Sequence, residues 1–138
     1  MPFRISTGIE NIDFPKLRNW LAEAYWSKLR TEEVIIKSLD NSDCFTAHLG
    51  DEMVGFARVV SDRATFAWLC DVYVDPGHRG TGVSRALMDA IMTHPDYATA
   101  RWLLGTRDAH GLYEKYGFVT STEPDRWMTK GFRDRFEP

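Results

Sequence analysis

Little cysteine, no long hydrophobic run and no excess of basic charge characterise this sequence, and each shortage excludes a class of protein. Only Cys44 and Cys70 occur in 138 residues, and both lie in apolar, strand-like runs. Two buried free thiols are therefore expected rather than a disulfide. No apolar run approaches the roughly 20 residues that cross a bilayer, and the N-terminus has no signal-peptide core. A cytoplasmic protein without a membrane partner is expected.

The balance of charge is slightly acidic, which argues against a broad nucleic-acid-binding surface. Lysine and arginine number 17 against 20 aspartate and glutamate residues, a formal net charge of −3, whereas nucleic-acid-binding domains usually present a basic face. The four histidines and two cysteines show no spacing typical of a metal site. The sequence therefore predicts neither a nucleic-acid partner nor a bound metal.

The chain shows no repeat, low-complexity tract or linker, so a single domain over residues 1–138 is expected. The apolar pattern predicts strands at Phe3–Ile9, Cys44–Leu49, Met53–Val60, Thr65–Val74, Trp102–Leu104, Phe118–Thr120 and Arg126–Lys130. Helices are predicted to begin at Pro15, after the cap Thr31, near Gly82 and after the cap Asp108.

These elements predict a mixed α/β sheet with helices on its faces. The strand–helix–strand crossover in the second half requires parallel strands there, whereas the hairpins are antiparallel. The apolar residues of the second helix are Val34, Ile35 and Leu39. Gly117 suits the left-handed position that follows the last helix.

The most informative segment is a basic, glycine-rich turn between the longest predicted strand and a helix. Gly80 and Gly82 are flanked by His78, Arg79 and Arg85. Backbone N–H groups and a helix N-terminus converge there, which suits a phosphate, although a solvated surface turn is the alternative. A P-loop is excluded because its lysine is missing, and a Rossmann fingerprint because its third glycine is missing.

Two segments resemble the GNAT superfamily of N-acetyltransferases. The run Arg79–Ser84 is similar to that family's [Q/R]-x-x-G-x-[G/A] acetyl-CoA motif: Arg79 and Gly82 match, and Ser84 stands where Gly or Ala is usual. The run Ala109–Phe118 is similar to its A-x-x-L-Y-E-K-x-G-F segment. Together, some 30 residues apart with a strand between them, the two matches are far more specific than either alone.

The resemblance implies a mostly antiparallel sheet with a central parallel strand pair and helices on both faces. It also implies acetyl-CoA as co-substrate, with pantetheine along a strand edge and the pyrophosphate on N–H groups of the turn. The resemblance further implies a bulge in that strand near Val72–Val74, with an exposed backbone N–H that polarises the acetyl carbonyl. Thr106 replaces an asparagine often found in the family. The implied cofactor residues are Val72, Tyr73, Val74, Arg79, Gly80, Thr81, Gly82, Val83 and Ser84.

The resemblance places a general acid at Tyr113, and it implies direct attack by the amine in a ternary complex. A phenol with a pKa of ~10 stays protonated at neutral pH and can protonate a departing thiolate. Asp71 is a candidate base, because an ionisable residue in an apolar strand is expected to have a raised pKa; a structural role is the alternative. A covalent route through Cys70 would need an oriented histidine, and an inert core thiol is expected instead.

The acceptor site is expected in the aromatic-rich N-terminal half, where Trp26 and Trp68 are the candidate pocket walls. The predicted function is N-acetylation of a primary amine of a small molecule. Acetylation of a protein amine and a non-catalytic acyl-CoA-binding module are the alternatives. A monomer or a homodimer is expected. The acceptor, the acyl-chain preference and the base stay undetermined by the sequence.

Overall fold

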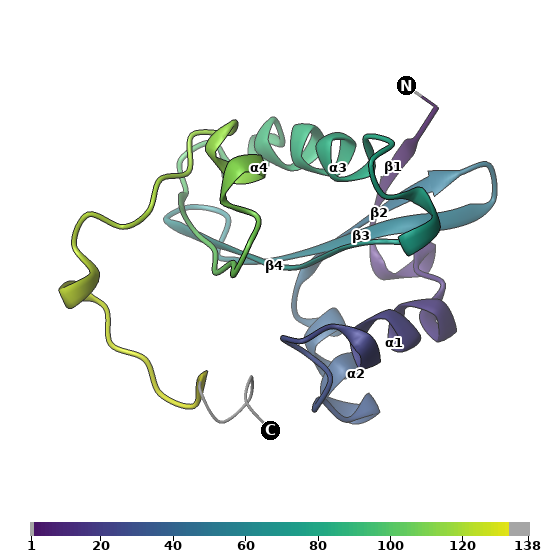
Figure 1. Ribbon diagram of the computed structural model, residues 1–138, viewed down its shortest axis with the longest axis horizontal. Coiled ribbons are helices and arrows are strands. Elements are labelled where there is room, and N and C mark those ends of the chain that lie inside the picture. Colours follow the sequence, from purple (N-terminus) through teal and green to yellow (C-terminus); the bar gives the residue numbers. More distant parts are fainter. Residues whose placement is uncertain (1, 133–138) are drawn as a thin grey trace.

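A five-stranded sheet forms the centre of the molecule, and the computed structural model describes residues 2–132 of the chain (Figure 1). The strands lie in chain order across the sheet: β1 Arg4–Thr7, β2 Asp43–Leu49, β3 Glu52–Ser61, β4 Phe66–Val74 and β5 Arg101–Leu103. Neighbouring strands from β1 to β4 are antiparallel, and β4 and β5 are parallel. The predicted mixed, mostly antiparallel fold with a parallel strand pair is confirmed, but that pair lies at one end of the described sheet and not at its centre.

Helices α1 and α2 lie on one face of the sheet, and α3 and α4 lie on the other (Figure 1). Their bounds are α1 Phe14–Glu23, α2 Glu32–Asp40, α3 Val83–Met92 and α4 His110–Glu114. Short 3-10 helices cover Ile9–Asn11, Pro76–His78, Pro95–Tyr97 and Pro124–Arg126. Each face of the sheet has its own buried apolar cluster beneath its helices. In the described range, no helix is long and apolar enough to cross a membrane.

Side-chain caps determine where α1 and α2 begin. Asp13 accepts a hydrogen bond from the first turn of α1 at 3.2 Å, and Thr31 accepts one from the N–H of Val34 at 3.2 Å. The cap predicted at Thr31 is confirmed. Ile35 and Leu39, four residues apart, are buried on the sheet side. Val34, the other apolar residue named for this helix, is exposed and projects from the first turn of α2.

Helix α3 approaches the sheet closely because Gly55 of β3 has no side chain. A Cβ at this position would lie 2.5 Å from Cγ1 of Val83 and 3.2 Å from Cδ1 of Leu87. Val83 and Leu87 are both fully buried. Since α3 follows the glycine turn directly, this close contact also holds the turn against the sheet.

Strand β4 has an open edge in its second half. β5 pairs only with its first three residues, Phe66 to Trp68, and ends at Leu103, whereas β4 continues to Val74. Within the described residues, no strand therefore covers the β5-side edge of β4 beyond Trp68. Its free N–H and C=O groups can pair with an extended ligand.

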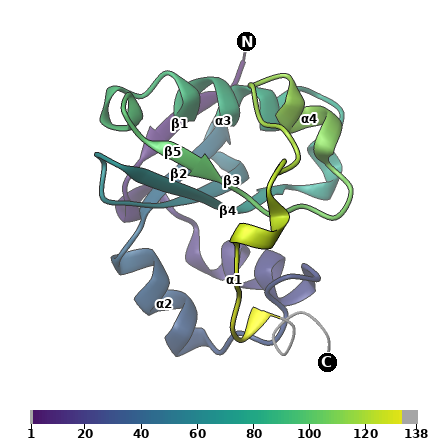
Figure 2. The same cartoon turned by 90° about the vertical axis from the view of Figure 1, so that its left-hand side faces the viewer.

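The chain after α4 does not complete the sheet, so the closing strands predicted at Phe118–Thr120 and Arg126–Lys130 are wrong. Phe118 packs on Trp102 and Tyr113, and residues 119–132 are exposed. An alternating pattern forms a strand only where a neighbouring edge can pair with it, and β5 is only three residues long. Figure 2 shows this segment crossing from the side of α4 to the side of α1.

Helix α4 begins without a side-chain cap, which corrects the cap predicted at Asp108. Ala109 is the N-cap residue, and its N–H donates to Oγ1 of Thr106 at 3.0 Å. Gly117 follows the helix with a φ of 89°, which confirms the predicted left-handed position.

Candidate active site

Strand β4 has a bulge among its predicted site residues. Ala57 of β3 lies opposite two residues of β4, Asp71 and Val72, because the pairing register shifts there. Asp71 has a φ of 54°, in the left-handed region that non-glycine residues seldom adopt. The bulge interrupts the ladder of hydrogen bonds, so it exposes backbone groups of β4 at this point.

The bulge also decides which face of the sheet Asp71 occupies. Leu69 lies two residues earlier, and in a regular strand the two side chains would share a face. Leu69 packs in the cluster beneath α3 and α4, whereas Asp71 points to the segment after α1, where it meets Trp26 and Arg30. The extra residue therefore moves the carboxylate to the side of α1 and α2.

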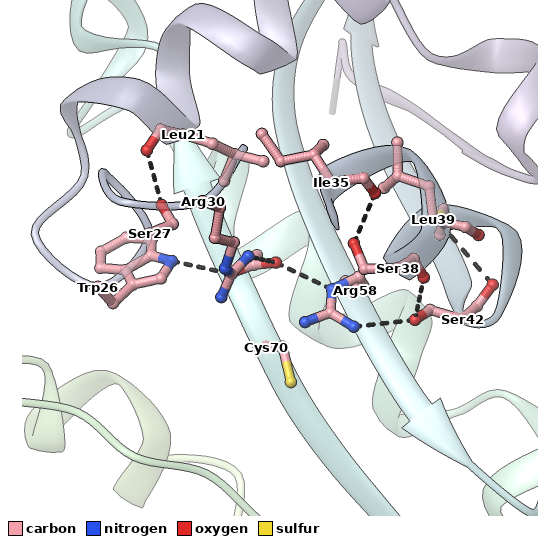
Figure 3. Close-up of polar contacts among 12 residues, drawn as sticks. Leu21, Trp26, Ser27, Arg30, Ile35, Ser38, Leu39, Ser42, Arg58 and Cys70 are labelled. Atoms are coloured by element: carbon pink, nitrogen blue, oxygen red, sulfur yellow. Dashed lines mark hydrogen bonds and ion pairs between the residues drawn. The ribbon is translucent and has the colours of Figure 1, made fainter. Parts of the chain in front are cut away.

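Three donors hold the buried Asp71 carboxylate (Figure 3). Trp26 Nε1 donates to Oδ1 at 2.8 Å, while Arg30 Nη1 and Arg58 Nε donate to Oδ2 at 2.8 and 2.9 Å. Arg58 Nη1 also donates to Oγ of Ser42 at 2.9 Å. The side chain of Asp71 is only 2% exposed. This network connects β3, β4 and the segment after α1.

The charge state of Asp71 differs from the expectation. Burial by itself raises the pKa of the carboxyl, but the hydrogen bonds and charges of Arg30 and Arg58 outweigh it and lower the pKa below its usual value. The predicted increase is therefore wrong, because the sequence pattern did not show the two arginines that face this position. At neutral pH Asp71 is an ionised, fully engaged ion-pair partner.

The glycine turn continues directly from the end of β4. Gly80 and Gly82 have φ values of 78° and 98°, in the region that favours glycine. Gly82 is the N-cap of α3 and no side chain caps that end, so the first N–H groups of the helix can face an anion. Arg79 Nε donates to the carbonyl oxygen of Val74 at 3.2 Å, and its guanidinium lies 5.4 Å from the ring centre of Tyr73. The predicted cofactor residues thus lie in two neighbouring segments, Val72–Val74 and Arg79–Ser84, that the short helix Pro76–His78 connects.

Tyr113 lies in α4 with a buried ring and a free hydroxyl. The residue is 9% exposed, and its ring packs edge-to-face on Phe118 with centres 6.1 Å apart. Among the described residues the hydroxyl has no hydrogen-bond partner. Every fully buried polar side-chain atom in this part of the chain does have a partner, so the hydroxyl cannot be fully buried. The hydroxyl therefore reaches the surface. Burial, with a smaller contribution from the nearby Tyr25, raises the pKa of Tyr113 to about 12, so the phenol is protonated at neutral pH.

Aromatic rings line the space between the segment after α1 and β4. Ring centres of Tyr25 and Trp26 lie 5.1 Å apart, and those of Trp26 and Tyr73 lie 6.4 Å apart. Arg107, in the loop after β5, stacks on Tyr25 with its guanidinium 3.9 Å from the ring centre. Arg79 therefore covers one face of the Tyr73 ring, and Arg107 covers one face of the Tyr25 ring.

The two predicted pocket walls, Trp26 and Trp68, have different neighbours. Trp26 belongs to the Asp71 network and to the aromatic surface just described. Trp68 lies earlier on β4 and stacks on Phe132 with ring centres 6.0 Å apart. Trp26 is adjacent to the bulge, whereas Trp68 is beside the segment that follows α4.

Both cysteines are free and buried, as predicted. Burial raises the pKa of Cys44 to about 11 and that of Cys70 to about 12, so both are thiols at neutral pH. A thiol is a poor nucleophile, so the covalent route has no support. No group of three His, Cys, Asp or Glu side chains in residues 2–132 could hold a metal ion.

Sequence patterns did not predict site roles for Tyr25, Arg30, Arg58 and Arg107. One signal was available for Arg58, which interrupts an apolar strand just as Asp71 interrupts the next one. A buried charge requires a partner, so two opposite charges in neighbouring apolar strands predict an ion pair. Arg30 and Arg107 lie in loops, where the apolar pattern gives no indication of position.

The chain is similar in sequence to known acetyltransferases. The model of an acetyltransferase (GNAT) domain matches residues 40–120, which contain the bulge, the glycine turn and Tyr113. An uncharacterized N-acetyltransferase from Porphyra purpurea is 25% identical over 130 residues, covering 86% of this chain and 71% of that protein.

Solved structures show the same fold. A crystal structure from Xanthomonas campestris pv. campestris, assigned to the GNAT family, shares 39% sequence identity with a TM-score of 0.93 and covers 99% of this chain and 97% of its own. A GNAT family acetyltransferase from Elizabethkingia anophelis with acetyl-CoA bound has a TM-score of 0.66 at 17% identity, covering 94% of this chain and 90% of that one. The second likeness supports the fold alone.

Proposed function

This chain belongs to the GNAT acetyltransferase family, and we propose that it transfers the acetyl group of acetyl-CoA to a primary amine of a small molecule. The observation that supports this most strongly is the sequence of features along β4: a bulge, an open strand edge and a glycine turn that ends in the N-terminus of α3. The acetyl-CoA-bound relative from Elizabethkingia anophelis has the same fold. Acetyl-CoA supplies an activated thioester.

The cofactor residues proposed from the sequence have roles that follow from this geometry. Backbone groups of Val72 to Val74 pair with the amide groups of the pantetheine arm along the open edge of β4. The N–H groups from Arg79 to Ser84 bind the pyrophosphate at the start of α3. A backbone N–H exposed by the bulge polarises the acetyl carbonyl, as an oxyanion hole does.

Tyr113 is proposed as the general acid. As the amine nitrogen bonds to the acetyl carbon and the C–S bond breaks, its hydroxyl gives a proton to the departing sulfur. Its free hydroxyl and a pKa raised to about 12 support this role, because the proton is present at neutral pH.

We propose that Asp71 serves the reaction as a positioning residue. Its two carboxylate oxygens accept from Trp26, Arg30 and Arg58, and it is ionised with a lowered pKa. Such a carboxylate is a weak acceptor for a proton from an ammonium group of pKa ~10.4. It holds the bulge of β4 against the segment after α1, and water takes the proton of the amine.

Release of free CoA thiol from acetyl-CoA, measured over a panel of small primary amines, tests this function. We expect amine-dependent release by the wild-type protein. Tyr113→Phe is expected to lower kcat about 10- to 100-fold with little change in KM for acetyl-CoA, because the ring is kept and only the proton donor is lost.

Tyr116→Phe is the matched control, since it removes a hydroxyl that bonds to Asp89 at 2.7 Å on α3 rather than facing the site. Its kcat is expected to stay close to the wild-type value. Full turnover by Tyr113→Phe would contradict the general-acid role. Binding of acetyl-CoA without CoA release on any amine would contradict the transferase function and favour a binding module.

A further inference from the structure

The Asp71 network contains more positive than negative charge. Arg30 and Arg58 both bond to Oδ2 of Asp71, at 2.8 and 2.9 Å. Within the described part of the chain, no other carboxylate lies within 4 Å of either guanidinium, and the further partner of Arg58 is the neutral hydroxyl of Ser42. Two cations share one anion, so the cluster has a net charge of +1.

This surplus charge is held largely away from water. The side chains of Arg58 and Arg30 are 10% and 21% exposed. A guanidinium cannot lose its charge at physiological pH, and a buried charge without a counterion is unfavourable. A second anion would therefore stabilise the cluster.

Each guanidinium also has N–H groups to offer such an anion. Arg30 uses only Nη1, and Arg58 uses Nε and Nη1. The Nη2 groups of both have no hydrogen-bond partner among residues 2–132. No fully buried polar side-chain atom there is unpaired, so each Nη2 group keeps some contact with solvent. In Figure 3 the guanidinium groups of Arg30 and Arg58 point toward one another.

The free N–H groups lie beside the position proposed for acetyl transfer. Both arginines contact Asp71, which is itself a residue of the β4 bulge. Trp26 donates to the same carboxylate and belongs to the aromatic surface. Arg107, stacked on Tyr25, adds another positive charge on the approach. A molecule whose amine reaches the bulge would place its neighbouring atoms against Arg30 and Arg58.

We propose that the acceptor is an amine that also carries a carboxylate, and that Arg30 and Arg58 bind this carboxylate. A planar guanidinium matches the two oxygens of a carboxylate, which makes it the preferred side chain for this group. The proposal rests on the proposed transferase function, but the anion site can be tested without turnover.

The first test compares 4-aminobutyrate with 4-aminobutanamide, which differ in charge and hardly in shape, by release of CoA thiol. The full-length wild-type protein is expected to prefer the carboxylate by about 10-fold or more in kcat/KM. Arg30→Gln leaves one guanidinium for one carboxylate, so the preference should fall to near unity. Arg30→Lys, which keeps the charge without the planar fork, should restore part of it.

Arg18→Gln is the matched control, because Arg18 pairs with Glu32 on the exposed side of the same helices at 2.8 Å. It should keep the wild-type preference. Equal kcat/KM for the two acceptors in the wild type, or a preference unchanged by Arg30→Gln, would overturn the proposal.

The second test measures thermal unfolding with butyrate, with butyramide and with chloride at equal ionic strength. A saturable rise in Tm with butyrate alone, lost in Arg30→Gln, is expected, because a ligand that binds only the folded state stabilises it. The same Tm in all three solutions would overturn the anion site. If butyrate stabilises through Arg30 while no amine releases CoA, the transferase proposal fails and the anion site stands.

Discussion

At the scale of single residues, two glycines with similar backbone conformations allow the effect of φ on stability to be measured apart from any effect on cofactor binding. Gly80, in the turn before α3, and Gly50, in the turn between β2 and β3, both have positive φ values, 78° and 60°. A Cβ added at either position would meet no atom within 4 Å. Both glycines therefore require the same left-handed backbone conformation, and both have space for a methyl group. Only Gly80 lies at the proposed pyrophosphate site.

Gly80→Ala and Gly50→Ala are expected to lower the free energy of unfolding by similar amounts, about 1 kcal/mol each, because both force alanine into the left-handed region. Only Gly80→Ala should raise KM for acetyl-CoA, since its methyl group occupies space beside the N–H groups of the turn. Chemical denaturation and steady-state kinetics measure the two effects. A KM that stays at the wild-type value in Gly80→Ala would contradict the placement of the pyrophosphate.

At the scale of secondary-structure elements, the contact between α3 and β3 positions the turn. The 2.5 Å approach of a Cβ at Gly55 to Cγ1 of Val83 leaves no room for a methyl group. Val83 is the first residue of α3, so any displacement there also moves the N–H groups that start the helix. Packing at Gly55 is therefore coupled to the geometry of the proposed pyrophosphate site.

Gly55→Ala is therefore expected to destabilise the fold by about 1–3 kcal/mol through overpacking. The double variant Gly55→Ala/Val83→Ala should be less destabilised than the sum of the single variants, because Val83→Ala removes the atom that is struck. Gly105→Ala is a suitable control, since a Cβ there meets nothing within 4 Å. If urea unfolding shows that the destabilisation of the double variant equals the sum for the two single variants, the expected clash between the added methyl group and Val83 is contradicted.

At the scale of the whole molecule, the Asp71 network joins parts of the chain that are far apart in sequence. Trp26 and Arg30 follow α1, Arg58 belongs to β3, and Asp71 belongs to β4. Removal of one partner from a buried ion pair costs about 3–5 kcal/mol. The network therefore contributes to global stability as well as to the shape of the site.

Acid should weaken this contribution. The pKa of Asp71 is lowered in the folded protein, so its stabilisation is complete above the unfolded pKa of ~3.9 and is lost as the pH falls through the folded pKa. We expect the free energy of unfolding to fall less steeply below about pH 5 in Asp71→Asn than in the wild type. Asp43 also has a lowered pKa, so some acid sensitivity should remain in the variant.

Arg30→Gln offers a second measurement of the same coupling. With Arg58 as the sole remaining guanidinium partner, the pKa of Asp71 is lowered less, so its stabilisation should be lost at a higher pH than in the wild type. Urea unfolding at a series of pH values measures both variants. Parallel curves for the wild type and both variants would contradict the role of Asp71 in acid stability.

Much of the fold and part of the site followed from the sequence by itself. Apolar periodicity located β1 to β5 and the four helices, Thr31 marked a helix start, and Gly117 marked a left-handed position. These features depend on residues that are neighbours along the chain, so a short window of sequence contains the physical information that determines them.

Other features were decided only by the tertiary structure. The bulge that turns Asp71 toward α1 depends on the register between β3 and β4, and the lowered pKa depends on arginines 13 and 41 positions away. The segments at Phe118–Thr120 and Arg126–Lys130 have a strand-like pattern, yet a strand also needs a partner edge. Contacts between distant residues are determined when the whole chain packs, and local pattern does not specify them. The turn proposed to bind the donor was therefore readable from the sequence, whereas the charge surplus proposed to select the acceptor was not.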